Sequence, residues 1–155
     1  MPEIKFTVPG DPVAKGRPRF VKMGKFTRAY TDKKTTDYES LVHNYAKNIN
    51  NAPQKPLDCP VSVEIAFVWK RIKALCGKDR KGQYKHQQGR IPKTTTPDID
   101  NTIKSILDGI NDSGIWVDDN KVYSITAQKF YAAVDELPHV EVVIRWDDQT
   151  EKIEE

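Results

Sequence analysis

The nine residues 61–69 restrict the possible folds of this chain more than any other segment. Every second side chain in them is apolar, and most are β-branched or aromatic: Val61, Val63, Ile65, Phe67 and Trp69. A period of two with such side chains is typical of a β-strand and does not fit a helix. The segment therefore predicts a strand with one apolar face in the core of a sheet.

Further strands are predicted by the same reasoning. Residues 3–8 alternate polar and apolar side chains and end at a Pro-Gly turn. Residues 122–131 and 140–146 also have the composition of strands and are joined through a Leu-Pro pair. A short hairpin is predicted from residues 19–22 and 25–28, which flank Met-Gly.

Two segments predict amphipathic helices because their apolar residues recur at the spacing of one helical face. In the first, residues 35–49, the face consists of Tyr38, Leu41, Val42, Tyr45, Ala46 and Ile49. In the second, residues 99–111, it consists of Ile99, Ile103, Ile106, Leu107 and Ile110. The Asn-Asp-Ser-Gly sequence from residue 111 supplies the stop signal for the second helix.

The order of these elements is strand, helix, strand, helix, strand, strand, which predicts the α/β class. We expect a small single domain in which a mixed β-sheet is packed by two helices. A chain of 155 residues can bury a sizeable core without disulfides. The domain is expected to span residues 1–146, and the acidic tail 147–155 has no apolar periodicity and is expected to fray.

Several classes of protein are excluded by composition and spacing. No apolar run reaches membrane-spanning length, and no leader pattern opens the sequence, so we expect a cytoplasmic protein without a membrane partner. The two cysteines and three histidines are not at the short spacings of a zinc site. Glycine-rich phosphate loops and serine or cysteine nucleophile arrangements are also missing from the sequence.

Basic residues are concentrated in two stretches. Residues 15–34 hold eight Lys or Arg against one acid, and residues 70–96 hold nine against one. Such a distribution attracts a polyanion, although many basic faces are only solvated. The candidate DNA contacts are Lys15, Arg17, Arg19, Lys73, Arg80, Lys81, Lys85 and Arg90. We interpret residues 70–96, with few apolar anchors, as a mobile arm that becomes ordered on DNA.

Acidic residues mark the candidate catalytic centre. Asp98 and Asp100 lie at the start of the second predicted helix, and Asp119 lies shortly after its end, before a strand. If the strand returns beside the helix, these three carboxylates converge and repel one another unless a cation lies among them. Hard oxygen ligands suit Mg²⁺ or Mn²⁺, and Lys104 could offset charge on a phosphate.

The same residues also have a purely structural explanation. Asp98 could cap the helix, and Asp100 is favoured by the helix dipole and lies four positions before Lys104. A calcium loop of the EF-hand type does not fit, because Ile103 occupies the position of its required glycine. Residue types alone therefore leave a metal site and a capped helix open as alternatives.

The acidic segment resembles the signature of the RusA family of phage and prophage Holliday-junction resolvases. That signature is Asp-x-Asp-Asn, a lysine four positions after the second aspartate, a helix, and Asp-Asp before a strand. In this chain the matching residues are Asp98, Asp100, Asn101, Lys104, Asp108 and the pair Asp118-Asp119. The stretch from Pro9 to Arg19, with Tyr30-Thr31 after it, is similar to the family's opening strand and basic loop.

The resemblance implies a homodimer that binds four-way DNA junctions and nicks two strands symmetrically with Mg²⁺ or Mn²⁺. It implies acidic catalytic and metal-binding roles for Asp98, Asp100 and Asp119, an essential cation at Lys104, and supporting roles for Asn101 and Asp118. The basic segment 70–96 is longer than in compact members of the family. Two alternatives stay open: a metal-dependent nuclease for flaps or forks, and a non-catalytic module that binds branched DNA.

Overall fold

The computed structural model describes residues 1–16, 19–30 and 32–148. These residues form two compact units, each assembled from segments that are distant in the sequence. The sheet unit contains Met1–Pro12, Cys59–Thr96 and the chain from Val122 on; the helical unit contains Val13–Asp58 and Pro97–Lys121. The predicted acidic tail lies, from residue 149 on, outside the described residues.

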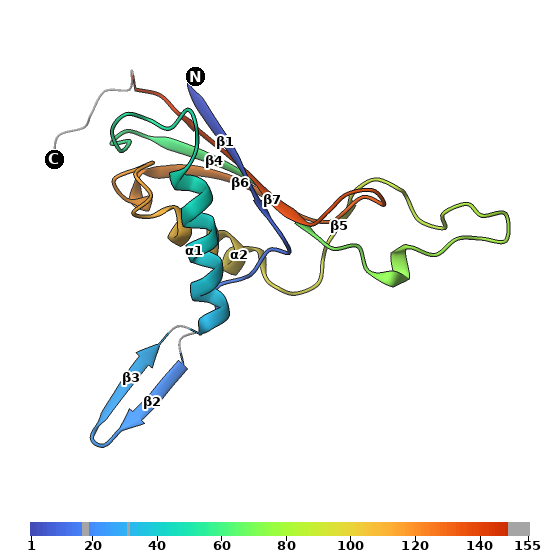
Figure 1. Cartoon of the computed structure of the whole chain (residues 1–155), viewed down its shortest axis with the longest axis horizontal. Coiled ribbons are helices and arrows are strands. Elements are labelled where there is room, and N and C mark those ends of the chain that lie inside the picture. Colours follow the sequence, from blue (N-terminus) through green and yellow to red (C-terminus); the bar gives the residue numbers. More distant parts are fainter. Residues whose placement is uncertain (17–18, 31, 149–155) are drawn as a thin grey trace. The chain divides into compact units, whose positions relative to one another are not determined.

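The sheet unit is built on a five-stranded mixed sheet (Figure 1). Its strands, in spatial order, are β1 (Glu3–Pro9), β7 (His139–Trp146), β4 (Val61–Trp69), β6 (Val122–Tyr131) and β5 (Ile91–Pro92). The β4–β6 pair is parallel, and the other three pairs are antiparallel. The predicted α/β class and mixed sheet are therefore confirmed.

Alternation along the strands explains how the sheet unit gets its core. In β4 the apolar set that predicted the strand is buried at Val61, Val63, Ile65 and Phe67. β1 and β7 bury every second side chain in the same way. The two-residue strand β5 was not predicted, because two residues are too few to show a period.

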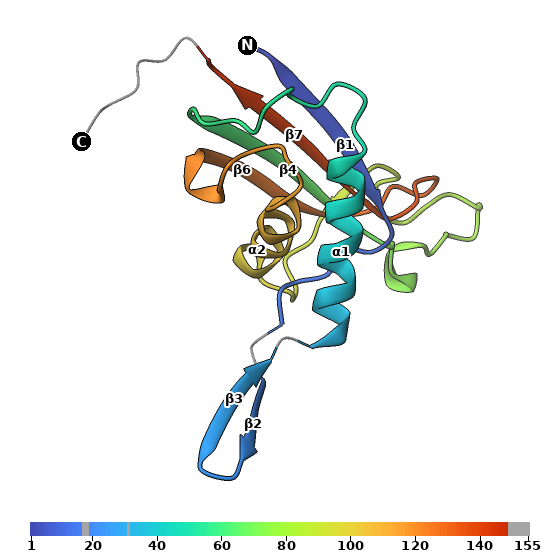
Figure 2. The same ribbon diagram turned by 60° about the vertical axis from the view of Figure 1, so that its left-hand side comes forward.

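The helical unit contains the predicted hairpin and both predicted helices (Figure 2). Its elements are β2 (Arg19–Met23), β3 (Phe26–Tyr30), α1 (Lys33–Lys47), α2 (Ile99–Ile110) and the short 3₁₀ turn η2 (Asp119–Lys121). α1 begins two residues earlier than expected because its N-cap is Asp32, whose side chain accepts a hydrogen bond from the Thr35 amide at 2.9 Å.

The two helices approach each other closely at Gly109 of α2. A Cβ atom placed on Gly109 would lie 2.6 Å from the Cβ of Val42 and 3.1 Å from the backbone oxygen of Glu39, both in α1. Gly109 and Val42 are themselves buried. Only a residue without a side chain therefore fits at this crossing.

The basic segment after β4 is more organised than its sequence predicts. Arg71 is 8% exposed and donates hydrogen bonds to four backbone carbonyls, those of Leu75, Gln87, Gly89 and Ala132. The segment also contains the 3₁₀ turn η1 (Lys73–Leu75) and an isolated bridge between Lys78 and Tyr84. Arg71, whose role the sequence did not reveal, therefore holds the base of the loop that we interpreted as a mobile arm.

Within the described residues, no helix combines the length and the apolar character needed to cross a membrane.

Candidate active site

The N-terminus of α2 presents a carboxylate that the helix does not use. Asp98 occupies the N-cap position, but its side chain makes no capping hydrogen bond. Its backbone oxygen instead accepts from the Thr102 amide at 3.2 Å and from the Thr102 hydroxyl at 2.7 Å. The structural explanation of Asp98 as a side-chain cap therefore fails, and its exposed carboxylate remains available.

Asp100 and Lys104 are both exposed on the first two turns of α2. Their spacing would allow an ion pair between them, but the described residues do not contain one. The Lys104 ammonium is instead 3.5 Å from the carboxylate of Asp108, one turn further along. Asp100, in the first turn, is favoured by the helix dipole, and nothing in the described part of the chain neutralises its side chain by an ion pair.

Asp108 connects Lys104 to the N-terminal segment of the helical unit. Lys15, predicted as a DNA contact, lies with its ammonium 2.7 Å from Asp108 and 2.7 Å from Glu39 of α1. Burial lowers the pKa of Lys15, but the hydrogen bonds to the two carboxylates outweigh it and raise the pKa overall. The Lys15 amide also donates to the backbone oxygen of Asn101 at 3.0 Å. Lys15 therefore ties α1 to α2 and is engaged within the chain.

Asp119 is held at the other end of α2. Its carboxylate accepts a hydrogen bond from the side-chain amide of Asn111, the C-cap residue, at 3.1 Å. The oxygen of the same amide accepts from the indole N–H of the buried Trp116 at 2.8 Å. Asn111 thus orients Asp119. The sequence had indicated only a helix stop at Asn111, and its side-chain role was missed.

Asp118 immediately precedes η2 and is exposed. Its carboxylate accepts a hydrogen bond from the backbone amide of Asp119 at 2.8 Å. This contact fixes the turn that presents Asp119.

The structure does not bring Asp119 to Asp98 and Asp100 within one chain, although the sequence led us to expect convergence. The eleven positions from Asp100 to Asn111 correspond to about 16 Å of helix rise. Accordingly, the three aspartates are not among the groups of potential metal ligands that come within 4.8 Å of one another in the described residues. α2 separates the two acidic ends of the motif.

The predicted DNA contacts fall into three sets. Four are exposed on the loop after β4: Lys73, Arg80, Lys81 and Lys85. Arg17 and the side chain of Arg19 lie outside the described residues. Arg90, like Lys15, is engaged within the chain, because its guanidinium binds Glu136 at 2.7 Å and also binds Glu141.

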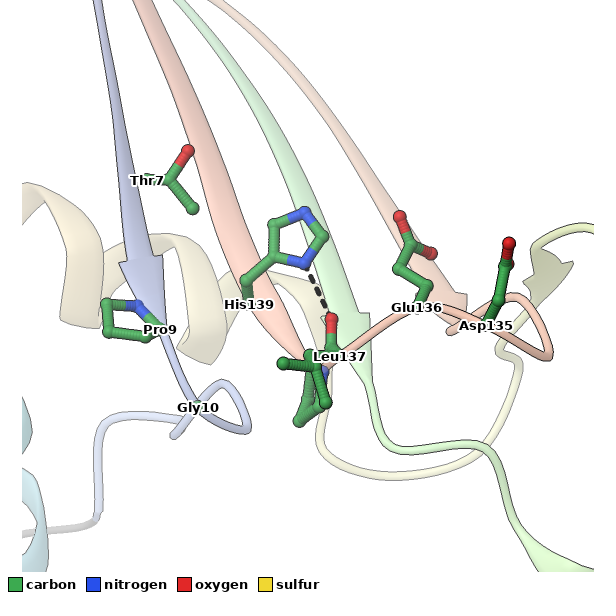
Figure 3. A pocket seen from close by; sticks show the side chains of 8 residues that line it. Thr7, Pro9, Gly10, Asp135, Glu136, Leu137 and His139 are labelled. Carbon is green, nitrogen blue, oxygen red and sulfur yellow. Dashed lines mark hydrogen bonds between the residues drawn. The ribbon is translucent and has the colours of Figure 1, made fainter.

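A second acidic group surrounds Arg90. In the described chain, Glu136, His139 and Glu141 form the one group of possible metal ligands with atoms within 4.8 Å. Glu136 and His139 also line a pocket of about 700 Å³ (Figure 3). The His139 ring nitrogens lie 2.8 Å from the Leu137 oxygen and 2.9 Å from Glu141, so each faces an acceptor. The Arg90 guanidinium already supplies the positive charge here. The group is therefore an ion-pair network and not a good metal site.

Acid titration is expected to expose the contribution of Arg90. Its hydrogen bonds hold the pKa values of Glu136 and Glu141 below the usual 4.5. A carboxylate with a lowered pKa stabilises the fold above its unfolded-state pKa, and this stabilisation is lost as the pH falls through the folded-state value. Replacing Arg90 by Met should lower the free energy of unfolding at pH 7 and flatten its decline below pH 4.5.

Denaturant titrations at several pH values between 7 and 3 measure this effect. Lys55→Met, at an exposed loop position, is the control for loss of one positive charge. Parallel stability curves for the wild type and Arg90→Met would contradict the network.

Two known sequences or families match most of the chain. The family model described as "Endodeoxyribonuclease RusA" matches residues 9–145. "Uncharacterized protein YqaN" of Bacillus subtilis (strain 168) is 34% identical to the chain over 145 residues, which cover 92% of this chain and 95% of that protein. The match covers the basic N-terminal segment, α2 and η2. The chain belongs to the RusA family of endodeoxyribonucleases.

Proposed function

We propose that this chain is a metal-dependent endodeoxyribonuclease that resolves four-way DNA junctions by paired, symmetric nicks. The observation that carries the proposal is the start of α2, where Asp98 and Asp100 expose carboxylates that neither cap the helix nor enter an ion pair of the described residues. Two uncompensated negative charges beside each other favour a cation. Membership of the family supports DNA as the substrate.

The donor set fits Mg²⁺ or Mn²⁺. Asp98, Asp100 and Asp119 offer only hard carboxylate oxygens, which these ions prefer to nitrogen or sulfur. The chemistry that such an ion supplies when bound is activation of water and stabilisation of charge on the phosphate.

Lys104 would place a positive charge beside the scissile phosphate. It lies one turn after Asp100, so both side chains are on the same face of α2. Its pairing with Asp108 restricts the position of the ammonium, and Lys15 in turn holds Asp108. Lys104 is 61% exposed and can therefore reach a bound backbone.

A second copy of the chain would complete the metal-binding set. Asn111 holds Asp119 about 16 Å of helix rise away from Asp100, so one chain does not supply all three carboxylates to one ion. In a two-fold homodimer, Asp98 and Asp100 of one copy can meet Asp119 of the other. The same symmetry would provide two equivalent sites for the two strands of a junction.

Cleavage of a labelled four-way junction in different metals tests the proposal. We expect paired nicks with Mg²⁺ or Mn²⁺, and binding without cutting in EDTA or Ca²⁺. Flap and fork substrates in the same assay distinguish the alternative nuclease from a resolvase. Undiminished nicking in EDTA would contradict the metal site, and binding without any cutting would favour the non-catalytic module.

A further inference from the structure

Two lysines meet over one aromatic ring near the C-terminal ends of β4 and β6. The ammonium of Lys93 lies 5.4 Å from the ring centre of Trp69, and that of Lys129 lies 5.9 Å from it. The Lys93 amide donates to the Lys129 carbonyl at 2.9 Å, continuing the pairing between β5 and β6. Both side chains therefore extend from adjacent segments to the same face of the sheet.

Like charges opposite each other on neighbouring strands reduce stability. Lys93 also lacks a carboxylate within ion-pair distance among the described residues. Its charge is partly compensated by the faces of Trp69 and of Tyr131, whose ring centre is 4.8 Å away. Aromatic rings do not supply a full negative charge, so this arrangement is suited to receiving an anion.

Hydroxyl groups complete the polar surface around the two lysines. The Lys93 ammonium donates to the Thr95 hydroxyl at 2.6 Å, and the Thr95 and Tyr131 hydroxyls are 3.0 Å apart. The hydrogen bond between Thr95 and Tyr131, together with the two nearby lysines, lowers the pKa of Tyr131. The lowered pKa agrees with a positive local potential.

We infer that Lys93 and Lys129, with the hydroxyls of Thr95 and Tyr131, bind a phosphodiester group of the DNA backbone. A phosphate oxygen accepts several hydrogen bonds at once, and its charge would pair with the Lys93 ammonium. The Lys129 ammonium, which donates to the Thr95 carbonyl at 2.6 Å, adds to the positive potential beside it. Neither lysine was among the DNA contacts predicted from the sequence. The choice of DNA as the source of the phosphate rests on the proposed function, whereas the anion site itself does not.

Salt-dependent binding of a labelled four-way junction, in EDTA, tests this site. Lys93→Met is expected to weaken binding at low salt about tenfold and to reduce the slope of log affinity against log salt by about one. The matched control is Lys5→Met, which removes one exposed positive charge from β1 at the opposite edge of the same sheet. The control should keep the wild-type slope, and identical slopes for both variants would overturn the inference.

Thermal unfolding separates anion binding from packing. Removing one of two opposed positive charges should leave the unfolding midpoint unchanged or raise it. If Lys93 only packs on Trp69, Lys93→Met should lower the midpoint while its binding slope matches that of Lys5→Met, and this result would overturn the inference.

A third measurement identifies the source of the phosphate. At constant ionic strength, inorganic phosphate should raise the unfolding midpoint of the wild type more than that of Lys93→Met if the free ion also binds. A midpoint shift without any change in the junction-binding slope would overturn the assignment to DNA. Failure of the wild type to bind junctions contradicts the proposed function. If the wild type binds and cuts junctions, but Lys93→Met and Lys5→Met have equal slopes of log affinity against log salt, only this inference is contradicted.

Discussion

Asp100→Asn and Asp119→Asn are each expected to lower junction cleavage more than about 100-fold, because each replaces a charged metal ligand by a neutral group of similar size. Junction affinity in EDTA should persist or rise, since the variants remove negative charge near the phosphate backbone. Cleavage rates and binding isotherms measured on the same preparations test both expectations. If Asp100 were only a first-turn helix residue, its replacement would cost under about 1 kcal/mol of stability and leave cleavage intact.

Mixing the two inactive variants distinguishes a site within one chain from a site between two chains. After exchange of subunits, a heterodimer of Asp100→Asn and Asp119→Asn has one shared site with both aspartates intact and one with neither. Cutting of a single strand should therefore return in the mixture. The control is a mixture of Asp98→Asn with Asp100→Asn, whose shared sites each lack one aspartate. Equal inactivity of both mixtures, with heterodimers demonstrated, would contradict the shared site.

Gly109→Ala is expected to destabilise the protein although alanine has the higher helix propensity. The new methyl group would meet the Val42 side chain at 2.6 Å, so α1 and α2 must separate. Overpacking of this kind costs about 1–3 kcal/mol, against a propensity gain of roughly 1 kcal/mol. We expect a fall of several degrees in the unfolding midpoint, and a larger fall for Gly109→Val.

A double-mutant cycle identifies the cause. Val42→Ala shortens the side chain that Gly109→Ala would meet, so the double variant should be more stable than the sum of the two single effects predicts. Gly89→Ala is the control, because no atom lies within 4 Å of its added Cβ. Additive effects, or a Gly109→Ala protein as stable as the wild type, would show that the crossing is not tightly packed.

Composition predicted β6 and β7, and periodicity predicted β1, β4 and both helices, because each of the latter has an apolar face long enough to repeat. Periodicity missed β5, which has two residues, and the role of Arg71, whose bonds are all to backbone oxygens and leave no pattern in the sequence. Spacing also correctly located Asp98 and Asp100 at the start of α2. It did not reveal that Asn111 would hold Asp119 at the far end, because a helix stop and an orienting amide look the same in sequence.

A basic side chain in the sequence was also an incomplete guide to a DNA contact, because some basic residues bind carboxylates within the chain. Lys15 and Arg90 are as basic as their neighbours in the sequence, yet each is engaged by two carboxylates from distant segments. Those carboxylates are 24 to 93 positions away along the chain. The basic stretches thus contain residues that stabilise the fold as well as residues exposed to a ligand.

The hydrogen bonds of Arg71 also determine which part of the loop after β4 is separated from the sheet. Its four carbonyl contacts close the base of the loop after β4, and three of the four acceptors lie within the loop's own two ends. Because this closure lies nearer the sheet, we expect insertions, deletions or substitutions between Lys78 and Tyr84 to leave the register of β4 against β6 unchanged. We therefore expect changes at the loop tip to alter the exposed basic surface of the loop while the sheet stays the same.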